Sequence, residues 1–411
     1  MHTARLRRFG LLAWAGLALT APSQAQIDPE PRRLVHFGYD QTLSGPGPTA
    51  GYLFYYLNEP HFPLRKATWR AAIAPTYLDS ELGLAGALGP HTDLGLGLAG
   101  GGFANSYSEV RSGDHVREDS FLGHGAGAAL SAYHLFNPGR QIPLYGVCRA
   151  SVQSLFYEKD RWTAQDFALP RDRTSVNLRT GLRFGGQEPF LDPLQALEIS
   201  AWHQSQLRLR PDSYGYAGDR SLEAYSHLFW GRILFNYRSK ASRHFSGSLT
   251  LGTSLDPDRM SAYKLGGLLP LTSEFPLGLP GYYTQELSAR RFALLNARYA
   301  FPLDRSGSWL FNLFAAGASI SYLPGLDQRD RWHSGVGCGI EHESYRRVWN
   351  LTLNYGYGIR AIRSGRYGAH SLTLLAQWDR LAGRQAAEEK PSPAEEGRHH
   401  HGLRWIPLWG K

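Results

Sequence analysis

Cysteine is scarce in this chain of 411 residues, which has only Cys148 and Cys338, each inside a strand-like segment. Two thiols exclude a disulfide scaffold for a chain of this length. We favour the interpretation that the two cysteines are small half-buried residues with free thiols, and a single disulfide bridge between them is the alternative. Long apolar runs are also missing, because no segment after the N-terminus has the eighteen or so apolar residues that a membrane helix needs. Helical membrane proteins are thereby excluded.

Familiar catalytic and cofactor motifs are absent as well. The chain has no Gly-x-Ser-x-Gly, His-Glu-x-x-His, P-loop or Cys-x-x-Cys motif. We therefore predict no catalytic residue, no metal and no cofactor, and we regard an enzyme as the less favoured class. A hydrolase with a dispersed triad stays open, because Ser, His and Asp are all available. The formal charge of +9 does not indicate nucleic acid, because the arginines are spread along the chain instead of forming one patch.

The N-terminus has the features of an export signal. A basic start is followed by an apolar stretch from Leu11 to Ala21 and by Ser23-Gln24-Ala25, which has the form of a cleavage site. We predict a signal peptide over residues 1–25 and a short lead over 26–33. The exported chain is therefore either a soluble secreted protein or a membrane β-barrel.

Composition and spacing favour strands throughout the rest of the chain. Glycine counts 46 and tyrosine 22, a composition typical of strands with glycine-rich bends. Turn signals divide the chain into about sixteen runs, an even number as in outer-membrane barrels. The runs are near 34–43, 50–58, 66–76, 80–88, 92–107, 121–136, 143–158, 174–185, 194–210, 222–238, 243–255, 286–303, 308–322, 332–344, 347–362 and 370–380.

Alternation and connection length identify the barrel. In one run Leu351, Leu353 and Tyr355 take one face, and polar or small residues take the other. A soluble sandwich also alternates, but here short turns alternate with long polar connections such as 256–285, as in a barrel with short periplasmic turns and long outer loops. We predict an all-β transmembrane antiparallel barrel over 34–381 in the bacterial outer membrane, with the lipid bilayer and its lipids as partners.

The end of the chain departs from this pattern. Residues 382–411 contain a polar, proline-containing stretch and then His399-His400-His401. We predict a polar, disordered C-terminal tail. Three adjacent histidines lack the spaced second half of a metal site, so a solvated tail is the favoured interpretation.

One stretch resembles a known family. Gly266-Gly267 opens a long Gly/Pro connection, Leu279-Pro280-Gly281-Tyr282 follows, and the next run ends Asn296-Ala-Arg-Tyr-Ala-Phe-Pro-Leu303. This order resembles the bacterial surface antigen barrels, a superfamily of outer-membrane assembly and translocation proteins that also supplies the barrel of patatin-like phospholipases. The resemblance implies sixteen strands and a sixth outer loop whose tip, here Leu279, Pro280, Gly281 and Tyr282, folds into the lumen.

The chain also departs from the family pattern. In the family an arginine at the loop tip pairs with acidic groups of the barrel wall, but Pro280 stands there and has neither charge nor N–H. The resemblance then leaves packing by Leu279 and Tyr282 to hold the loop. The first expected strand begins soon after the cleavage site, so we expect no periplasmic POTRA domains and allow a separate periplasmic or outer-membrane protein partner.

Alternation places several charged residues on the luminal face. These lumen-facing candidates are Arg179, Arg183, Arg232, Arg298, Arg360, Glu198 and Glu341. Rings of arginine would favour an anion-selective channel. The favoured alternative is that they pair across strands and fill the interior. We therefore predict a plugged or restricted pore, or a transport or assembly accessory. An outer-membrane hydrolase of lipase or protease type and a structural or adhesive barrel are the alternatives.

Overall fold

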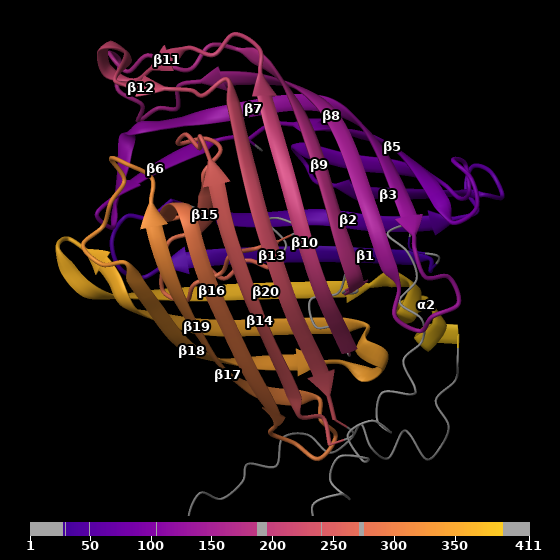
Figure 1. The fold of residues 1–411 in the computed structure, drawn as a ribbon. Helices are drawn as coiled ribbons and strands as arrows, with labels where there is room; N and C mark the ends of the chain where they lie inside the picture. Colours follow the sequence, from indigo (N-terminus) through magenta and orange to yellow (C-terminus); the bar gives the residue numbers. More distant parts are fainter. Residues whose placement is uncertain are drawn as a thin grey trace, which may run out of the picture.

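The structure is a closed antiparallel β-barrel (Figure 1). It is a computed structural model that describes residues 28, 30–48, 50–103, 105–186, 195–239, 241–270 and 275–388. Eighteen strands share one sheet; β6 and β15 only extend outer loops, so sixteen form the barrel. The predicted signal peptide and the tail beyond residue 388 lie outside the described residues.

The barrel strands follow one another in chain order around the wall. They are Arg32–Thr42 (β1), Ala50–Pro60 (β2), Ala67–Ile73 (β3), Tyr77–Leu84 (β4), Thr92–Gly101 (β5), Asp114–Leu135 (β7), Leu144–Glu158 (β8), Arg173–Gly186 (β9), Gln195–Arg208 (β10), Tyr225–Arg238 (β13), His244–Leu255 (β14), Leu287–Pro302 (β16), Trp309–Tyr322 (β17), Trp332–Glu343 (β18), Trp349–Arg363 (β19) and Arg366–Asp379 (β20). The outer loops add Tyr107–Arg111 (β6), Ser213–Tyr214 (β11), Arg220–Ser221 (β12) and Tyr263–Leu265 (β15).

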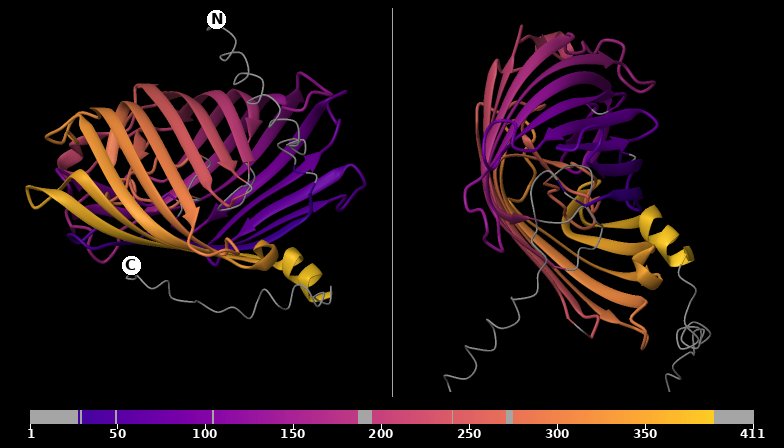
Figure 2. Two further views of the ribbon diagram at one scale, coloured as in Figure 1. Left: turned by 90° about the horizontal axis from the view of Figure 1, so that it is seen from below. Right: turned by 90° about the vertical axis from the view of Figure 1, so that its right-hand side faces the viewer.

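The first and last strands close the barrel. β1 pairs with β20 from Leu34 opposite Asp379 to Thr42 opposite Ser371 without a break. Figure 2 shows the indigo start of the sheet beside its yellow end. The predicted all-β fold is confirmed, and so is the predicted count of sixteen strands. A long connection at 256–286 is the sixth on the outer side, and we call it loop 6.

Two segments differ from the expectation. The connection between the runs predicted near 92–107 and 121–136 contains a hairpin, because β6 pairs with an outward extension of β7. The tail predicted from residue 382 begins instead inside the helix Arg380–Glu388 (α2), at the end of the barrel that carries the short turns. No helix in the described ranges is long and apolar enough to cross a membrane.

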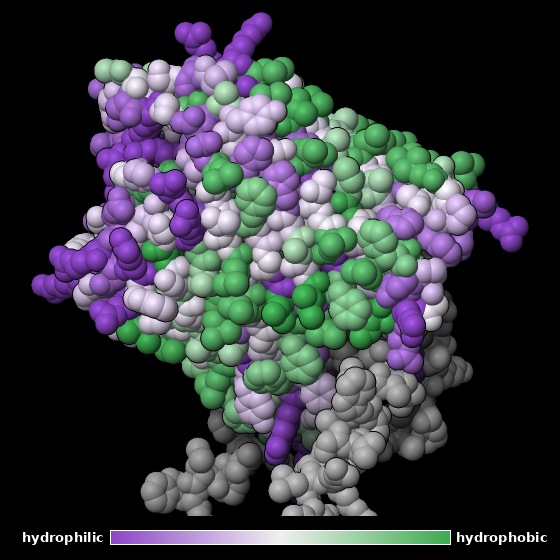
Figure 3. Space-filling view, viewed as in Figure 1, coloured by the Kyte–Doolittle hydropathy of each residue, from purple (hydrophilic) through white to green (hydrophobic). Residues whose placement is uncertain are grey.

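An apolar belt surrounds the strands. Alternate residues of each strand are exposed and apolar, as in Ile233 and Phe235 of β13 or Leu351 and Leu353 of β19. Figure 3 shows this green belt between more hydrophilic ends. The residues between them face the lumen and are mostly polar or small. This is the two-faced pattern of a strand with lipid on one side and a polar interior on the other.

The apolar belt predicts that a charged side chain destabilises the barrel more at the middle of the membrane than at its edge. Ile233 lies in the middle of β13 and is 50% exposed, whereas Leu255 ends β14 at the outer side and is 54% exposed. Ile233→Arg should lower the free energy of unfolding from bilayers by about 2–4 kcal/mol, and Leu255→Arg by at most about 1 kcal/mol. Denaturant unfolding in lipid vesicles measures both. Equal costs at the two positions would contradict the membrane position of the belt.

Candidate functional site

The candidate site is the lumen where loop 6 is seated. The loop tip lies against a patch of small residues on three strands, Gly335 of β18, Gly356 and Gly358 of β19, and Ala369 of β20. We call this patch the glycine floor. A Cβ at Gly335 would collide with the Pro280 carbonyl oxygen, and one at Gly281 would collide with the Gly358 backbone. Backbone therefore packs on backbone, which the glycines of the patch and Gly281 allow because they have no Cβ.

The base of loop 6 is closed by its two glycines. The Gly266 N–H donates to the Leu277 carbonyl at 2.9 Å, and the Leu279 N–H donates to the Gly267 carbonyl at 2.9 Å. Both glycines have positive φ, 134° and 72°. A Cβ at either position would strike Tyr283 or Thr284. The Gly-Gly pair therefore lets the returning arm of the loop lie directly beside the outgoing arm.

Packing holds the loop tip as expected from its residues. Leu279 and Tyr282 are fully buried in a cluster with residues of β15 to β17. The Tyr282 hydroxyl lies 3.0 Å from Nδ1 of His333, and the two rings meet edge to face. Nε2 of His333 in turn contacts the Tyr322 hydroxyl. These contacts place the tip of loop 6 against the inner side of the barrel wall.

An ion pair anchors the C-terminal end of the loop. Nη1 and Nη2 of Arg363 on β19 bind Oε1 and Oε2 of Glu286 at 3.0 and 2.8 Å. The same guanidinium stacks 3.5 Å from the Tyr283 ring centre and reaches the Gly281 carbonyl at 3.4 Å. Burial raises the pKa of Glu286, and Arg363 opposes that rise. The Tyr283 N–H also donates to Glu286 at 2.8 Å. We call this pair the loop lock.

The lock reverses the polarity that the family resemblance implies. That resemblance has an arginine in the loop and acids in the wall, whereas here the loop supplies Glu286 and the wall supplies Arg363. Sequence reasoning missed both residues. A signal was available, because from residue 265 to 289 the chain has Glu274 and Glu286 but no Lys or Arg. A carboxylate entering a barrel interior needs a cation from the wall.

The loop also reaches the opposite wall. Phe275 lies between Trp202 of β10 and Trp230 of β13, with ring centres 5.4 and 5.6 Å away. The Arg232 guanidinium covers the Phe275 ring at 4.7 Å. Loop 6 thus extends across the lumen from β10 and β13 to the glycine floor.

Most of the predicted lumen-facing residues have polar or charged partners inside the barrel. Glu198 is fully buried and accepts from Arg183 at 2.9 Å, from Arg232 at 2.8 and 3.1 Å, and from Ser200 at 2.8 Å. Glu341 contacts Arg298, which also lies 3.0 Å from Nδ1 of His244. Arg179 donates to Gln204 at 3.0 and 2.8 Å and covers Trp230.

Arg360 is placed differently from the other candidates. It is exposed on the outer surface, 3.7 Å from Asp330 and stacked on Tyr367. The ladder between β19 and β20 shifts register between Gly358 and Ile362. Ile359 and Arg360 are both exposed at this bulge, so the alternation of faces changes there. Strict alternation would have put Arg360 inside and Arg363 outside, and the bulge exchanges them.

The outer loops pack into a cap beside loop 6. Arg220 of β12 contacts Asp119 of β7 and stacks on Phe167 and Tyr214, and all four side chains are buried. Arg259 at the start of loop 6 pairs with Glu109 of β6. These contacts bind four outer loops to one another.

The described residues give little support to a hydrolase. Ser120 Oγ lies 3.4 Å from Nε2 of His115, but the hydroxyl is buried and donates to the Val116 carbonyl at 2.8 Å. No group of three His, Cys, Asp or Glu side chains in the described ranges could hold a metal. Cys148 and Cys338 are free thiols.

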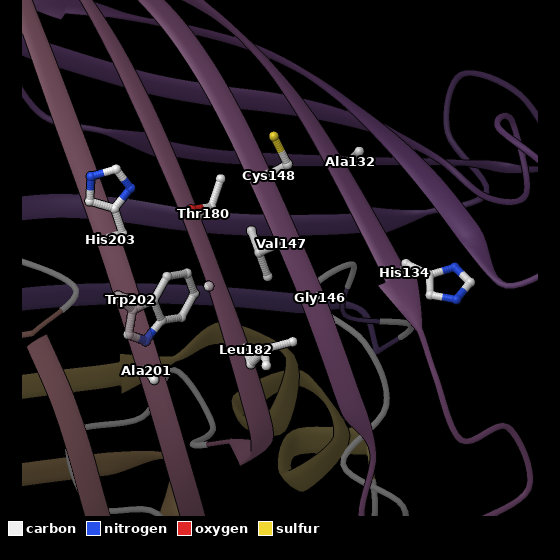
Figure 4. A pocket seen from close by; sticks show the side chains of 11 residues that line it. Ala132, His134, Gly146, Val147, Cys148, Thr180, Leu182, Ala201, Trp202 and His203 are labelled. Atoms are coloured by element: carbon white, nitrogen blue, oxygen red, sulfur yellow. The ribbon is translucent and has the colours of Figure 1, made fainter. Parts of the chain in front are cut away.

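A depression of about 570 Å³ lies on the wall of β7 to β10 (Figure 4). It occurs where the wall is lined by small residues such as Ala132, Cys148, Thr180 and Ala201. Cys148 and Ala201 belong to the exposed alternate of their strands, so the depression opens toward lipid. Trp202 is buried on the opposite face and fills the lumen side. The depression is therefore not a passage through the wall.

The closed barrel, its apolar belt and its infolded loop define a transmembrane β-barrel of the bacterial outer membrane. No protein-family model and no curated protein matches the chain. Among solved structures it is similar to CdiB from Escherichia coli, with 12% identity, a TM-score of 0.55 and coverage of 85% of this chain and 64% of that one. For BamA from Haemophilus ducreyi lacking POTRA domains 1–3 the values are 10%, 0.52, 85% and 71%.

For CdiB from Acinetobacter baumannii the identity is 10%, the TM-score 0.51 and the coverage 84% of this chain and 60% of that one. The chain thus spans less than two thirds of either CdiB chain. Identities this low show a shared fold. The chain therefore has the barrel fold of CdiB and BamA, and its relation to patatin-like phospholipases stays a prediction.

The glycine floor predicts sensitivity to a single methyl group. Gly335→Ala should displace the loop tip and lower the free energy of unfolding by about 1–3 kcal/mol, because the added carbon meets the Pro280 carbonyl. Denaturant unfolding and protease cleavage of loop 6 are the measurements. Gly317→Ala is the matched control, since nothing lies within 4 Å of a Cβ there. Similar effects of the two substitutions would show that the floor is not a tight seat.

The loop lock predicts a strong asymmetry between single and double variants. Arg363→Met should destabilise the loop by about 3–5 kcal/mol, because it leaves the buried Glu286 unpaired. Arg363→Met combined with Glu286→Leu should recover most of that loss, since two apolar side chains then replace the pair. Protease cleavage rates of loop 6 measure the difference. Additive losses in the double variant would contradict a direct pairing.

Proposed function

We propose that this protein is a plugged pore of the outer membrane, in which loop 6 closes the lumen. The observation that carries the proposal is the seating of Pro280 and Gly281 on the glycine floor, together with the lock between Glu286 and Arg363. A loop held on both walls leaves no wide passage through the lumen. Solute passage then requires the loop to leave its seat.

The paired interior argues against a fixed anion filter. Arg183 and Arg232 share the buried carboxylate of Glu198, and Arg298 contacts Glu341. Arginines that are held by buried carboxylates at hydrogen-bond distance carry less uncompensated charge than the open positive ring that selects anions. These arginines therefore stabilise the barrel interior by pairing with its carboxylates, and they do not serve as an anion-selective filter.

The energy that holds the plug suggests how it is released. A buried ion pair with good geometry contributes little net stability relative to apolar residues, yet breaking it alone costs several kcal/mol. A ligand or protein that offered Glu286 or Arg363 a new partner would lower that cost. In a transport or assembly accessory, the other predicted role, a partner protein would supply the displacement.

Planar-bilayer conductance tests the plug. The parent protein should show no steady openings, and a variant lacking residues 265–283 should conduct steadily, because the lumen is then open. Arg363→Ala should give brief openings. Arg366→Ala in the same hairpin is the matched control and should stay silent, since Arg366 is exposed and outside the lock.

Two results would contradict the proposal. Steady conductance of the parent would mean that the loop leaves an open path. A deletion variant that inserts but stays silent would mean that other groups close the lumen. Activity of the parent on lipid or peptide substrates would instead favour the hydrolase alternative.

A further inference from the structure

An arginine-rich rim follows the outer ends of β16 to β20. All of its arginines are exposed. We call the set the arginine rim, and its members are Arg290, Arg291, Arg329, Arg331, Arg360 and Arg366. In the part of the chain that the structure describes, β16 pairs with β17, β17 with β18, β18 with β19 and β19 with β20, so the rim occupies one continuous sector of the wall.

Two bulges turn side chains of this sector toward the outside of the barrel. Among the described pairings between barrel strands, register shifts occur between Ala289 and Arg291 of β16 and between Gly358 and Ile362 of β19. Both lie at the outer ends of their strands and beside rim arginines. Bulges re-aim side chains at barrel rims. Arg291 lies opposite the exposed Ser321, which puts it on the outer face of the wall.

Aromatic side chains mark the depth of the rim. Trp332 is 72% exposed and Tyr367 is 41% exposed, and both lie beside rim arginines. Tyr355, closer to the apolar belt, contacts Nδ1 of His370. Exposed tryptophan and tyrosine concentrate where a bilayer meets water. The guanidinium groups therefore stand just outside the apolar belt, at the level of lipid headgroups.

The rim keeps an excess of positive charge. Three carboxylates lie on or beside the same loops: Asp327 and Asp330 between β17 and β18, and Asp114, which accepts from the Ser364 N–H. The six rim arginines exceed them by three (6 − 3). Among the rim arginines, all of which lie in the described ranges, only Arg360 forms an ion pair. Its partner is Asp330 at 3.7 Å, and the Arg360 side chain is half exposed. Figure 3 shows hydrophilic residues gathered at this end of the strands.

We propose that the arginine rim binds the phosphate groups of outer-leaflet lipid headgroups. Guanidinium groups bind phosphate oxygens through two parallel N–H donors, and weak hydration suits them to an interface. Lipid phosphates are the anions held at this depth beside the belt. This inference rests on the membrane position of the barrel and is independent of whether loop 6 plugs the lumen.

Lipid retention measures this binding. The refolded barrel is incorporated into phosphatidylcholine vesicles that contain diphosphoryl lipid A, extracted in mild detergent and examined by native mass spectrometry. A variant with R291A, R331A, R360A and R366A should bind lipid A up to about 600-fold more weakly, since each of the four basic residues near an anionic surface contributes roughly five-fold. Its retention of lipid A should fall at least about 20-fold, which is less than the gain from two such residues. The doubly substituted R140A/R305A protein, altered at exposed arginines of the short turns, is the control and should match the parent.

Three outcomes would overturn the proposal. Equal retention by folded rim variant and parent would exclude the rim as the site. Equal retention of dephosphorylated lipid A by the parent would show that acyl chains, and not phosphates, are bound. Displacement of lipid A by millimolar inorganic phosphate would show a general anion site instead of a lipid site. Single-channel recordings of the same variant keep this test separate from that of the plug.

Discussion

The pairing of Glu286 with Arg363 is the interaction on which the closed lumen depends. A carboxylate carried into a barrel interior is costly unless a cation and further donors meet it there. Arg363 supplies two N–H groups to Glu286 and the Tyr283 N–H supplies a third. The pair fixes the end of loop 6 at the position where β16 begins. The rest of the loop is then confined to the space between the two walls.

The wall accommodates the loop by leaving out side chains. The loop tip meets Gly335, Gly356 and Gly358, and its own Gly281 lies so close to Gly358 that a Cβ there would collide with the backbone. Lost side-chain contacts are replaced by backbone contacts and by the burial of Tyr282 and Leu279. An arginine at the position of Pro280 would need a carboxylate in the floor, where the chain has glycine. The glycine floor therefore requires a loop tip without an arginine, and the ion pair that holds the loop is formed instead by Glu286 of the loop and Arg363 of the wall.

Regular strands were predictable from the sequence, because lipid on one side and a polar lumen on the other impose a period of two on every strand. All sixteen predicted runs correspond to barrel strands, and the infolded loop follows from Gly266, Gly267 and the tip residues. The partners inside the lumen were not predictable, since Glu286 and Arg363 are 77 residues apart and meet only when the barrel closes. Helix α2 was missed because its polar composition resembles a linker.

The bulge in β19 explains the one predicted luminal arginine that lies outside. Between Gly358 and Ile362 three residues of β19 stand opposite one residue of β20, and across this bulge Arg360 lies on the outer surface and Arg363 faces the lumen. A strand without the bulge would place Arg363 in contact with lipid headgroups and leave Glu286 buried without a cation. The same bulge therefore supplies the lock with its arginine and the rim with another. A strict period of two therefore gives the wrong face for Arg360 and Arg363. The change of face at the bulge supplies an arginine to the loop lock and another to the outer surface.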